Sequence, residues 1–149
     1  MLIFYFLKST IRHKILVYRI GRKLGGHWPR LLLHDLDRLI NPRMFKAYLK
    51  YASGDYSDLR SQSRHFKKAD HHWQYWMHLD DHGHTHYFDM PFQCIIEMVA
   101  DWIATGIGKK GRESVDVWYE KHKDQILITD RNRVYVEALL LYYRSSLTS

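Results

Sequence analysis

The fold is indicated most clearly by residues 91–105, PFQCIIEMVADWIAT. Pro91 suits the first turn of a helix, because proline lacks the backbone N–H and its φ is already helical. Apolar residues then recur at helical spacing: Ile95, Ile96, Val99, Trp102 and Ile103. Glu97 and Asp101 are four residues apart and therefore share a face beside this apolar side. The stretch predicts a core helix that presents two carboxylates to one site.

Towards the N-terminus, the pattern predicts several more helices. Residues 2–24 repeat apolar side chains at helical spacing and stop at two glycines. A second helix is expected to start at Pro29 and end near Asn41, which places His34 and Asp35 inside a strongly apolar helix. Residues 42–56 indicate a short helix and an irregular turn. A longer helix is expected from Ser57 or Ser61 to about Asp80.

The C-terminal part continues the helical pattern. Residues 80–90, DDHGHTHYFDM, indicate a loop, and Gly106, Gly108 and Gly111 with two lysines indicate a flexible connector. The stretch SVDVWYEKHK predicts a short helix, and Thr129 and Asp130 cap the last one. No repeat or alternating strand pattern of useful length is found. We expect an all-α, single-domain bundle of five or six helices over residues 1–149.

Composition limits the classes of partner. A chain of 149 residues that is 46% hydrophobic can form its own core, and the lone Cys94 cannot form an intrachain disulfide. The opening MLIFYFL is too short to span a bilayer, since Lys8 interrupts it, and we expect it to be the buried start of a helix. A cytoplasmic protein is predicted, in the host cytoplasm if it is phage-encoded. The formal charge of +7 favours anionic partners such as nucleotides, nucleic acid or acidic lipid.

Eleven histidines in a chain of this length are the more specific anomaly. Imidazole and carboxylate suit Mn, Fe, Co, Ni and Zn, so the question is whether enough ligands converge. The candidates come from four predicted helices: His13; His34 and Asp35; His65 with His71 or His72; and Glu97 with Asp101. In a continuous helix seven residues advance about 700°, so His65 and His72 lie only about 20° apart while His71 points elsewhere.

Each piece has a simpler explanation. A lone histidine on an apolar helix face is usually a hydrogen-bonded core residue. His34 and Asp35 could be an interior polar pair, although a buried carboxylate without a cation is costly. Glu97 and Asp101 could form a solvated face. Because so many polar ligands on apolar helices are hard to stabilise without metal, the joint pattern favours a metal site.

The order of these residues resembles the HD-domain superfamily of metal-dependent phosphohydrolases, over roughly residues 13–101. These helical proteins show His, then His-Asp, then further His, then Asp. The corresponding residues are His13, His34, Asp35, His65, His72 and Asp101. More closely, the stretches HDLDR, HFKKADHHWQYW and MPFQCIIEMVADW look like an uncharacterised family of phage and bacterial proteins, known only as a domain of unknown function.

The resemblance implies a hydrolase of nucleotides or related phosphate esters that uses a metal-activated water and one or two divalent transition-metal ions. It implies that the first ion is held by His13, His34, Asp35 and Asp101. His65 and His72 would hold a second ion or bind the leaving oxygen. Glu97 would orient ligands or act as a general base. Arg38, where the superfamily usually has lysine, would neutralise phosphate charge together with Lys14, Lys67 or Lys68.

Several alternatives remain open. The superfamily also contains di-iron oxygenases with two histidines after the His-Asp pair, and a third possibility is a non-catalytic protein that binds a nucleotide or nucleic acid. His82, His84 and His86 resemble a metal-binding tract but have no apparent partner, so a solvated loop or lid is expected. Core packing is expected for Trp73, Trp76 and Trp102, with stacking on a base as the alternative. The pattern does not distinguish among nucleotide substrates or oligomeric states.

Overall fold

The computed structural model describes residues 2–52, 54, 59–108 and 113–147. Most of these residues are helical, which confirms the predicted all-α class, and two short strands form a hairpin. The helices are α1 (Leu2–Lys23), α2 (Trp28–Leu33), α3 (Asp37–Ile40), α4 (Pro42–Ala52), α5 (Leu59–Phe66), α6 (Phe92–Gly108), α7 (Val115–His122) and α8 (Asp130–Ser145). The strands are β1 (Met77–Leu79) and β2 (Thr85–Tyr87), and the single-turn 3₁₀ helices are Trp73–Trp76 and Lys123–Gln125.

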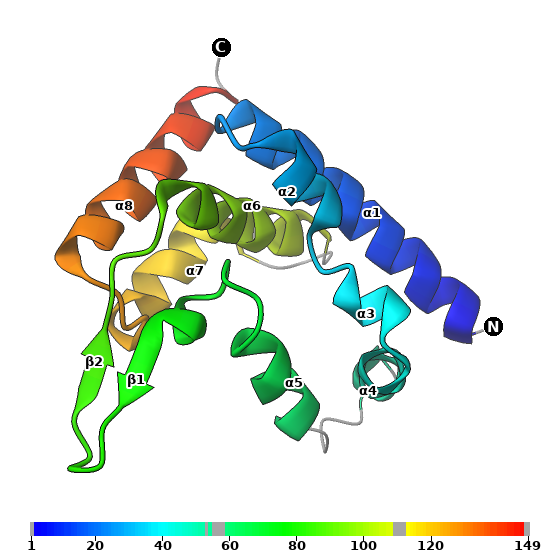
Figure 1. Cartoon of the computed structure of the whole chain (residues 1–149). Coiled ribbons are helices and arrows are strands. Elements are labelled where there is room, and N and C mark those ends of the chain that lie inside the picture. Colours follow the sequence, from blue (N-terminus) through cyan, green and yellow to red (C-terminus); the bar gives the residue numbers. More distant parts are fainter. Residues whose placement is uncertain (1, 53, 55–58, 109–112, 148–149) are drawn as a thin grey trace.

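Helix α6 lies in the middle of the molecule and packs against α1, α7 and α8 (Figure 1). Every residue from Cys94 to Asp101 is buried, so the middle of this helix is covered on all sides. Its apolar neighbours in the core include Val17, Ile20, Leu31, Val136 and Leu139. Glu97 and Asp101 are therefore carried into the interior, and the solvated-face alternative for them is wrong.

The predicted second helix is interrupted at the His-Asp pair. Helix α2 ends at Leu33, a turn follows, and α3 begins at Asp37. Asp35 has a φ of 51°, in the left-handed region that residues other than glycine seldom adopt. In a continuous helix, the adjacent side chains of His34 and Asp35 would point about 100° apart. Because the helix is interrupted here, the turn buries both side chains.

The predicted helix over 57–80 is wrong beyond Phe66, where α5 ends. A turn follows, in which the Trp76 indole N–H donates to the carbonyl of Asp70 at 2.7 Å. The chain then enters the hairpin of β1 and β2, so the predicted loop over 80–90 contains a strand. Helix α6 also continues to Gly108, through the first part of the predicted connector. The rest of that connector, and most of the turn predicted after residue 52, lie outside the described residues.

The start of α1 is less buried than predicted. Phe6 is buried, but Ile3, Phe4 and Tyr5 are all more than half exposed. None of the helices in the described ranges is long and apolar enough to cross a membrane.

The two C-terminal helices begin at side-chain caps. Ser114 accepts from the N–H of Val117 at the start of α7, and Thr129 accepts from the N–H of Asn132 at the start of α8. The predicted cap at Thr129 is thereby confirmed. Asn132 is itself buried and accepts from the N–H of Met90, which ties the segment before α6 to α8.

Candidate metal centre

A cluster of histidine and carboxylate side chains lies where four parts of the chain meet. They are α1, the α2–α3 turn, α5 with the segment that follows it, and α6. We call this cluster the buried cluster; its members are His13, His34, Asp35, His65, His71, His72, Glu97 and Asp101. All are buried except His13, whose side chain is 20% exposed. The structure thus brings together the six residues that the resemblance assigns as ligands and also His71 and Glu97, which were further candidates from the sequence.

One group in this cluster consists of His13, His34 and Asp101. Asp101 Oδ1 lies 3.0 Å from His13 Nε2 and 3.8 Å from His34 Nε2. These potential ligand atoms lie within 4.8 Å of one another. Asp35 is next to this group, because its Oδ2 is 3.4 Å from His34 Nε2. Residues from α1, the α2–α3 turn and α6 therefore meet at one point.

A second group consists of Asp35, His65, His71 and His72. Asp35 Oδ1 is 3.1 Å from His65 Nε2 and 3.4 Å from His71 Nε2. His72 Nε2 is 3.0 Å from His65 Nε2. The prediction that His71 points elsewhere is wrong, because it assumed a continuous helix and α5 has ended before His71. Both neighbouring histidines face the site, and the Asp35 carboxylate lies between the two groups.

Two carboxylates outside these groups contact the Nδ1 atoms of three imidazoles, on the side of each ring that faces away from the potential metal. Glu97 Oε1 lies 2.8 Å from His34 Nδ1 and 3.2 Å from His71 Nδ1. Asp37 Oδ2 lies 2.9 Å from His65 Nδ1. An imidazole whose Nδ1–H donates to a carboxylate presents the Nε2 lone pair to a metal, and metal-binding histidines are commonly held in this way. The Nε2 atoms of these three histidines all face Asp35 or Asp101.

Arg30 contacts Glu97, and Asp70 contacts Arg30. Neither residue was predicted from the sequence. Arg30 Nε is 2.5 Å from Glu97 Oε2, and its terminal nitrogens donate to Asp70. Asp70 directly precedes His71, so the Arg30–Asp70 pair connects α2 to the turn that carries the histidines. Asp37 was not predicted either, and its closeness to the His-Asp pair in HDLD is the signal that could have found it, whereas no pattern signal singles out Arg30.

Several polar atoms at the centre of the cluster are buried and form no hydrogen bond of regular geometry with the described residues, although charged groups lie close to them. They are the Nε2 atoms of His13, His34 and His71 and both carboxylate oxygens of Asp35. Burying such atoms without partners is costly. Divalent cations bound in the two groups would satisfy these atoms, and neutral imidazoles with carboxylates are the ligands that Zn, Mn, Fe, Co and Ni accept. The donor set therefore fits a metal site.

The local charges keep the carboxylates ionised. Burial by itself would raise the pKa of Asp35, but His34 and the Arg38 guanidinium hold it well below its usual range. Burial opposes ionisation of Glu97 in the same way, yet its hydrogen bonds with His34 and His71 lower its pKa to about 2. Both groups are therefore negative at neutral pH and complement a cation.

The two adjacent histidines differ in their electrostatic surroundings. Burial would lower the pKa of His71, but its contacts with the Asp35 and Glu97 carboxylates raise it to about 10. Burial and the neighbouring charge of His71 lower the pKa of His72 to about 3. His72 is therefore neutral and has a lone pair for a ligand, whereas His71 must lose a proton before it binds a metal.

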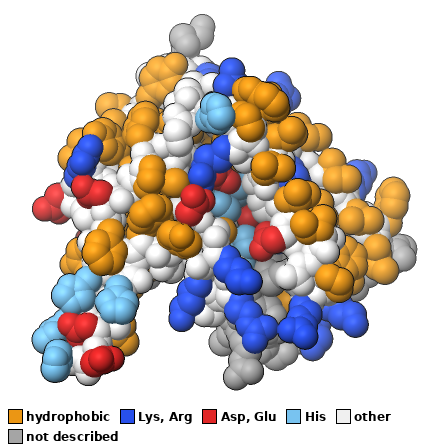
Figure 2. All heavy atoms as spheres, in the orientation of Figure 1, with side chains coloured by type: hydrophobic (Ala, Val, Ile, Leu, Met, Phe, Trp, Pro, Cys, Tyr) orange, Lys and Arg blue, Asp and Glu red, His pale blue; other side chains and the backbone are white. Residues whose placement is uncertain are grey.

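A pocket of about 470 Å³ opens onto the buried cluster and has His34, Asp35, His71 and Glu97 in its wall. Figure 2 shows a hollow near the centre of the visible face where acidic, basic and histidine side chains meet. Of the predicted phosphate-binding residues, Lys68 lines this pocket. Arg38 Nη1 lies 2.7 Å from Asp35 Oδ2, and Lys14 donates to the carbonyl of His34. Lys67 is exposed and is not among the lining residues.

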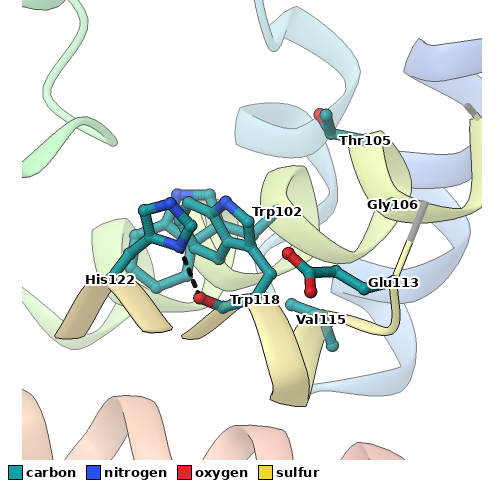
Figure 3. A pocket seen from close by; sticks show the side chains of 7 residues that line it. All are labelled: Trp102, Thr105, Gly106, Glu113, Val115, Trp118 and His122. Carbon is teal, nitrogen blue, oxygen red and sulfur yellow. Dashed lines mark hydrogen bonds between the residues drawn. The ribbon is translucent and has the colours of Figure 1, made fainter. Parts of the chain in front are cut away.

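Another pocket, of about 620 Å³, lies between α6 and α7 (Figure 3). It is lined by Trp102, Thr105, Gly106, Glu113, Val115, Trp118 and His122. The predicted core packing of Trp73, Trp76 and Trp102 is confirmed, since all three pack against the hydrophobic core. Trp102 also forms part of this pocket's wall, where its ring centroid is 5.4 Å from that of Trp118. No member of the buried cluster lines this pocket.

These features define a helical protein with a buried histidine and carboxylate cluster able to hold metal. The chain belongs to the family of unknown function DUF5662, whose pattern matches residues 2–141. This range includes the whole buried cluster. No curated protein and no solved structure matches the chain.

Proposed function

We propose that the chain is a metal-dependent phosphohydrolase that acts on a nucleotide or a related small phosphate ester. One observation carries the proposal: His13, His34, Asp35 and Asp101 lie close together in the buried cluster. These residues also occur in the order that is typical of the HD-domain superfamily. These ligands are spread over about ninety residues of chain and are brought together by the fold.

The arrangement supports two ions, because Asp35 lies between two groups of ligands. When bound, such ions lower the pKa of a water and polarise the phosphoryl oxygen. His13, His34 and Asp101 would hold one ion, and His65, His71 and His72 the other, with Asp35 available to both.

The pocket and its basic residues support a small anionic substrate. Its volume of about 470 Å³ falls within the usual range for small-molecule sites. Lys68 lies in its wall, and Arg38 lies beside Asp35, where a guanidinium can stabilise developing charge on a phosphoryl group.

Glu97 is better suited to positioning than to proton abstraction. Its carboxylate faces His34, His71 and Arg30, and its lowered pKa makes it a weak base. Of the two roles considered from the sequence, we therefore propose that Glu97 orients the two imidazoles.

Asp35→Asn tests the proposal, because it keeps the shape of the side chain and removes its charge. Protein purified without chelator is analysed for metals and assayed with Mn²⁺ or Co²⁺ against a panel of mononucleotides, deoxynucleoside triphosphates and cyclic nucleotides. We expect the wild type to contain metal and release phosphate or nucleoside, and the variant to lose both. His27→Gln, at an exposed histidine, is the control. Full turnover in Asp35→Asn, or no hydrolysis of any substrate by metal-loaded wild type, contradicts the proposal.

Arg38→Ala tests the phosphate contact separately from the metal. We expect the metal content to persist while kcat/KM falls by about two orders of magnitude, the usual effect of removing one charge-stabilising donor. Arg43→Ala changes an exposed arginine in the next helix and serves as the matched control. An equal loss in both variants would show that Arg38 has no special role.

A di-iron oxygenase is the second candidate, favoured by the group of Asp35 with three histidines. Anaerobic loading with Fe²⁺ followed by exposure to oxygen distinguishes the two. An oxygenase gives an oxygen-dependent absorption change and consumes oxygen. Hydrolysis of a nucleotide with Mn²⁺ or Co²⁺, without oxygen consumption, excludes this candidate.

A further inference from the structure

The β1–β2 hairpin carries a second concentration of histidines, separate from the buried cluster. It projects from the helical body (Figure 1) and contains His78, His82, His84 and His86, all exposed. The sequence pattern predicted a solvated loop without a partner for this tract. The structure confirms the exposure but supplies the partner, because Asp80 faces two of the histidines.

The register of the hairpin places four of these side chains on one face. His78 pairs directly with His86 in the antiparallel ladder. Asp80 and His84 each lie two residues nearer the turn, and the N–H of Asp80 donates to the carbonyl of His84 at 3.0 Å. Side chains two residues apart on a strand point to the same face, and directly opposite residues have adjacent Cβ atoms. His78, Asp80, His84 and His86 therefore form two adjacent cross-strand pairs on a single face.

The two oxygens of Asp80 have different contacts. Oδ1 accepts from the backbone N–H groups of His82 and His84, at 2.9 Å and 2.8 Å, and so fixes the turn. Oδ2 faces the imidazoles instead, 2.9 Å from His86 Nε2 and 3.3 Å from His84 Nδ1. Figure 2 shows histidine side chains gathered around acidic ones at the end of the hairpin. The turn thus holds one carboxylate oxygen among nitrogen ligands.

We propose that His78, Asp80, His84 and His86 form a surface site for one divalent transition-metal ion such as Zn²⁺ or Ni²⁺. Three imidazoles and one carboxylate are a ligand set that Zn²⁺ accepts in tetrahedral sites. The three histidine side chains are exposed and Asp80 is half-buried beside them, so the histidines can rotate onto an ion that arrives from solvent without opening the core. The bound ion would connect the two strands of a short hairpin, which is marginally stable by itself.

Retention of the untagged protein on an immobilised Ni²⁺ column is the first test. His84→Gln/His86→Gln removes two ligands on the proposed face, and His27→Gln removes an exposed histidine on the loop before α2. We expect the double variant to elute well before the wild type. His27→Gln should elute together with the wild type. Equal retention of the double variant and the wild type overturns the site.

A Zn²⁺ titration in competition with a chromophoric chelator gives the stoichiometry. We expect the wild type to bind one more equivalent than His84→Gln/His86→Gln, and single His86→Gln to weaken that equivalent at least tenfold. Asp35→Asn should keep this equivalent while it loses metal from the buried cluster, so the failure of one site is distinguishable from the failure of the other. Unchanged stoichiometry in the double variant, with its helical circular dichroism intact, contradicts the proposal.

Discussion

Asp35 shows how one residue joins backbone strain to the chemistry of the site. Its left-handed φ of 51° costs about 1–3 kcal/mol in a residue with a side chain, and such residues gather at functional sites. This conformation follows His34, where the backbone has already left the helix, and the Asp35 carboxylate lies between His34 on one side and His65 and His71 on the other. The strained backbone therefore belongs to the residue whose carboxylate contacts both ligand groups.

At the same scale, Glu97→Gln tests the positioning role. The amide keeps the size of the side chain but accepts hydrogen bonds from His34 and His71 less strongly and cannot balance Arg30. We expect the metal affinity of the buried cluster to fall by about 10–100-fold, as is typical when a carboxylate behind a metal-binding histidine is removed. Competition with a chromophoric chelator measures it. Glu137→Gln, which changes a carboxylate on α8 near Tyr119, is the control and should leave the metal affinity unchanged. Equal metal affinity in the wild type and Glu97→Gln refutes the positioning role of Glu97.

At the scale of elements, the position of the His-Asp turn depends on close packing of α2 against α1. Gly26 donates its N–H to the carbonyl of Gly21 at 2.7 Å, just before α2 begins. A Cβ on Gly26 would come within 2.8 Å of that carbonyl oxygen and 3.0 Å of an Ile96 methyl group. The first of these atoms belongs to the backbone of α1, so it cannot move aside as a flexible side chain can.

We therefore expect Gly26→Ala to lower the free energy of unfolding by about 1–3 kcal/mol, the usual cost of forcing an extra methyl group into a packed site. Gly108→Ala at the end of α6 is the matched control, because its Cβ would meet open space. Urea denaturation followed by circular dichroism compares the two. Unfolding of both variants at the wild-type midpoint would show that the site at Gly26 has room for the extra methyl group.

At the scale of the molecule, the buried cluster connects segments that are distant in sequence. His13 comes from α1, His34 and Asp35 from the α2–α3 turn, His71 from the segment after α5, and Asp101 from α6. An ion bound there would hold these segments together in the folded state but not in the unfolded chain. Metal binding should consequently stabilise the whole fold.

We expect metal at one hundred times its dissociation constant to add about 2.7 kcal/mol of stability, a rise in Tm of roughly 5–10 °C for a chain of this size. Calorimetry of chelator-treated protein with and without added Mn²⁺ or Zn²⁺ measures the shift. In Asp35→Asn most of the shift should disappear, whereas His84→Gln/His86→Gln should retain it. A metal-independent Tm in the wild type would show that the cluster does not bind these ions.

The sequence by itself determined the helical class, the central helix over 91–105, the cap at Thr129 and most of the residues that meet in the cluster. These features depend on local spacing, capping and residue type, which a linear pattern contains. Only the tertiary structure decided where two predicted helices stop, at Leu33 and Phe66. An apolar run such as residues 31–40 is compatible with one helix until packing decides which side chains are covered. The break at Asp35, the inward turn of His71 and the contacts of Arg30 all require partners far along the chain.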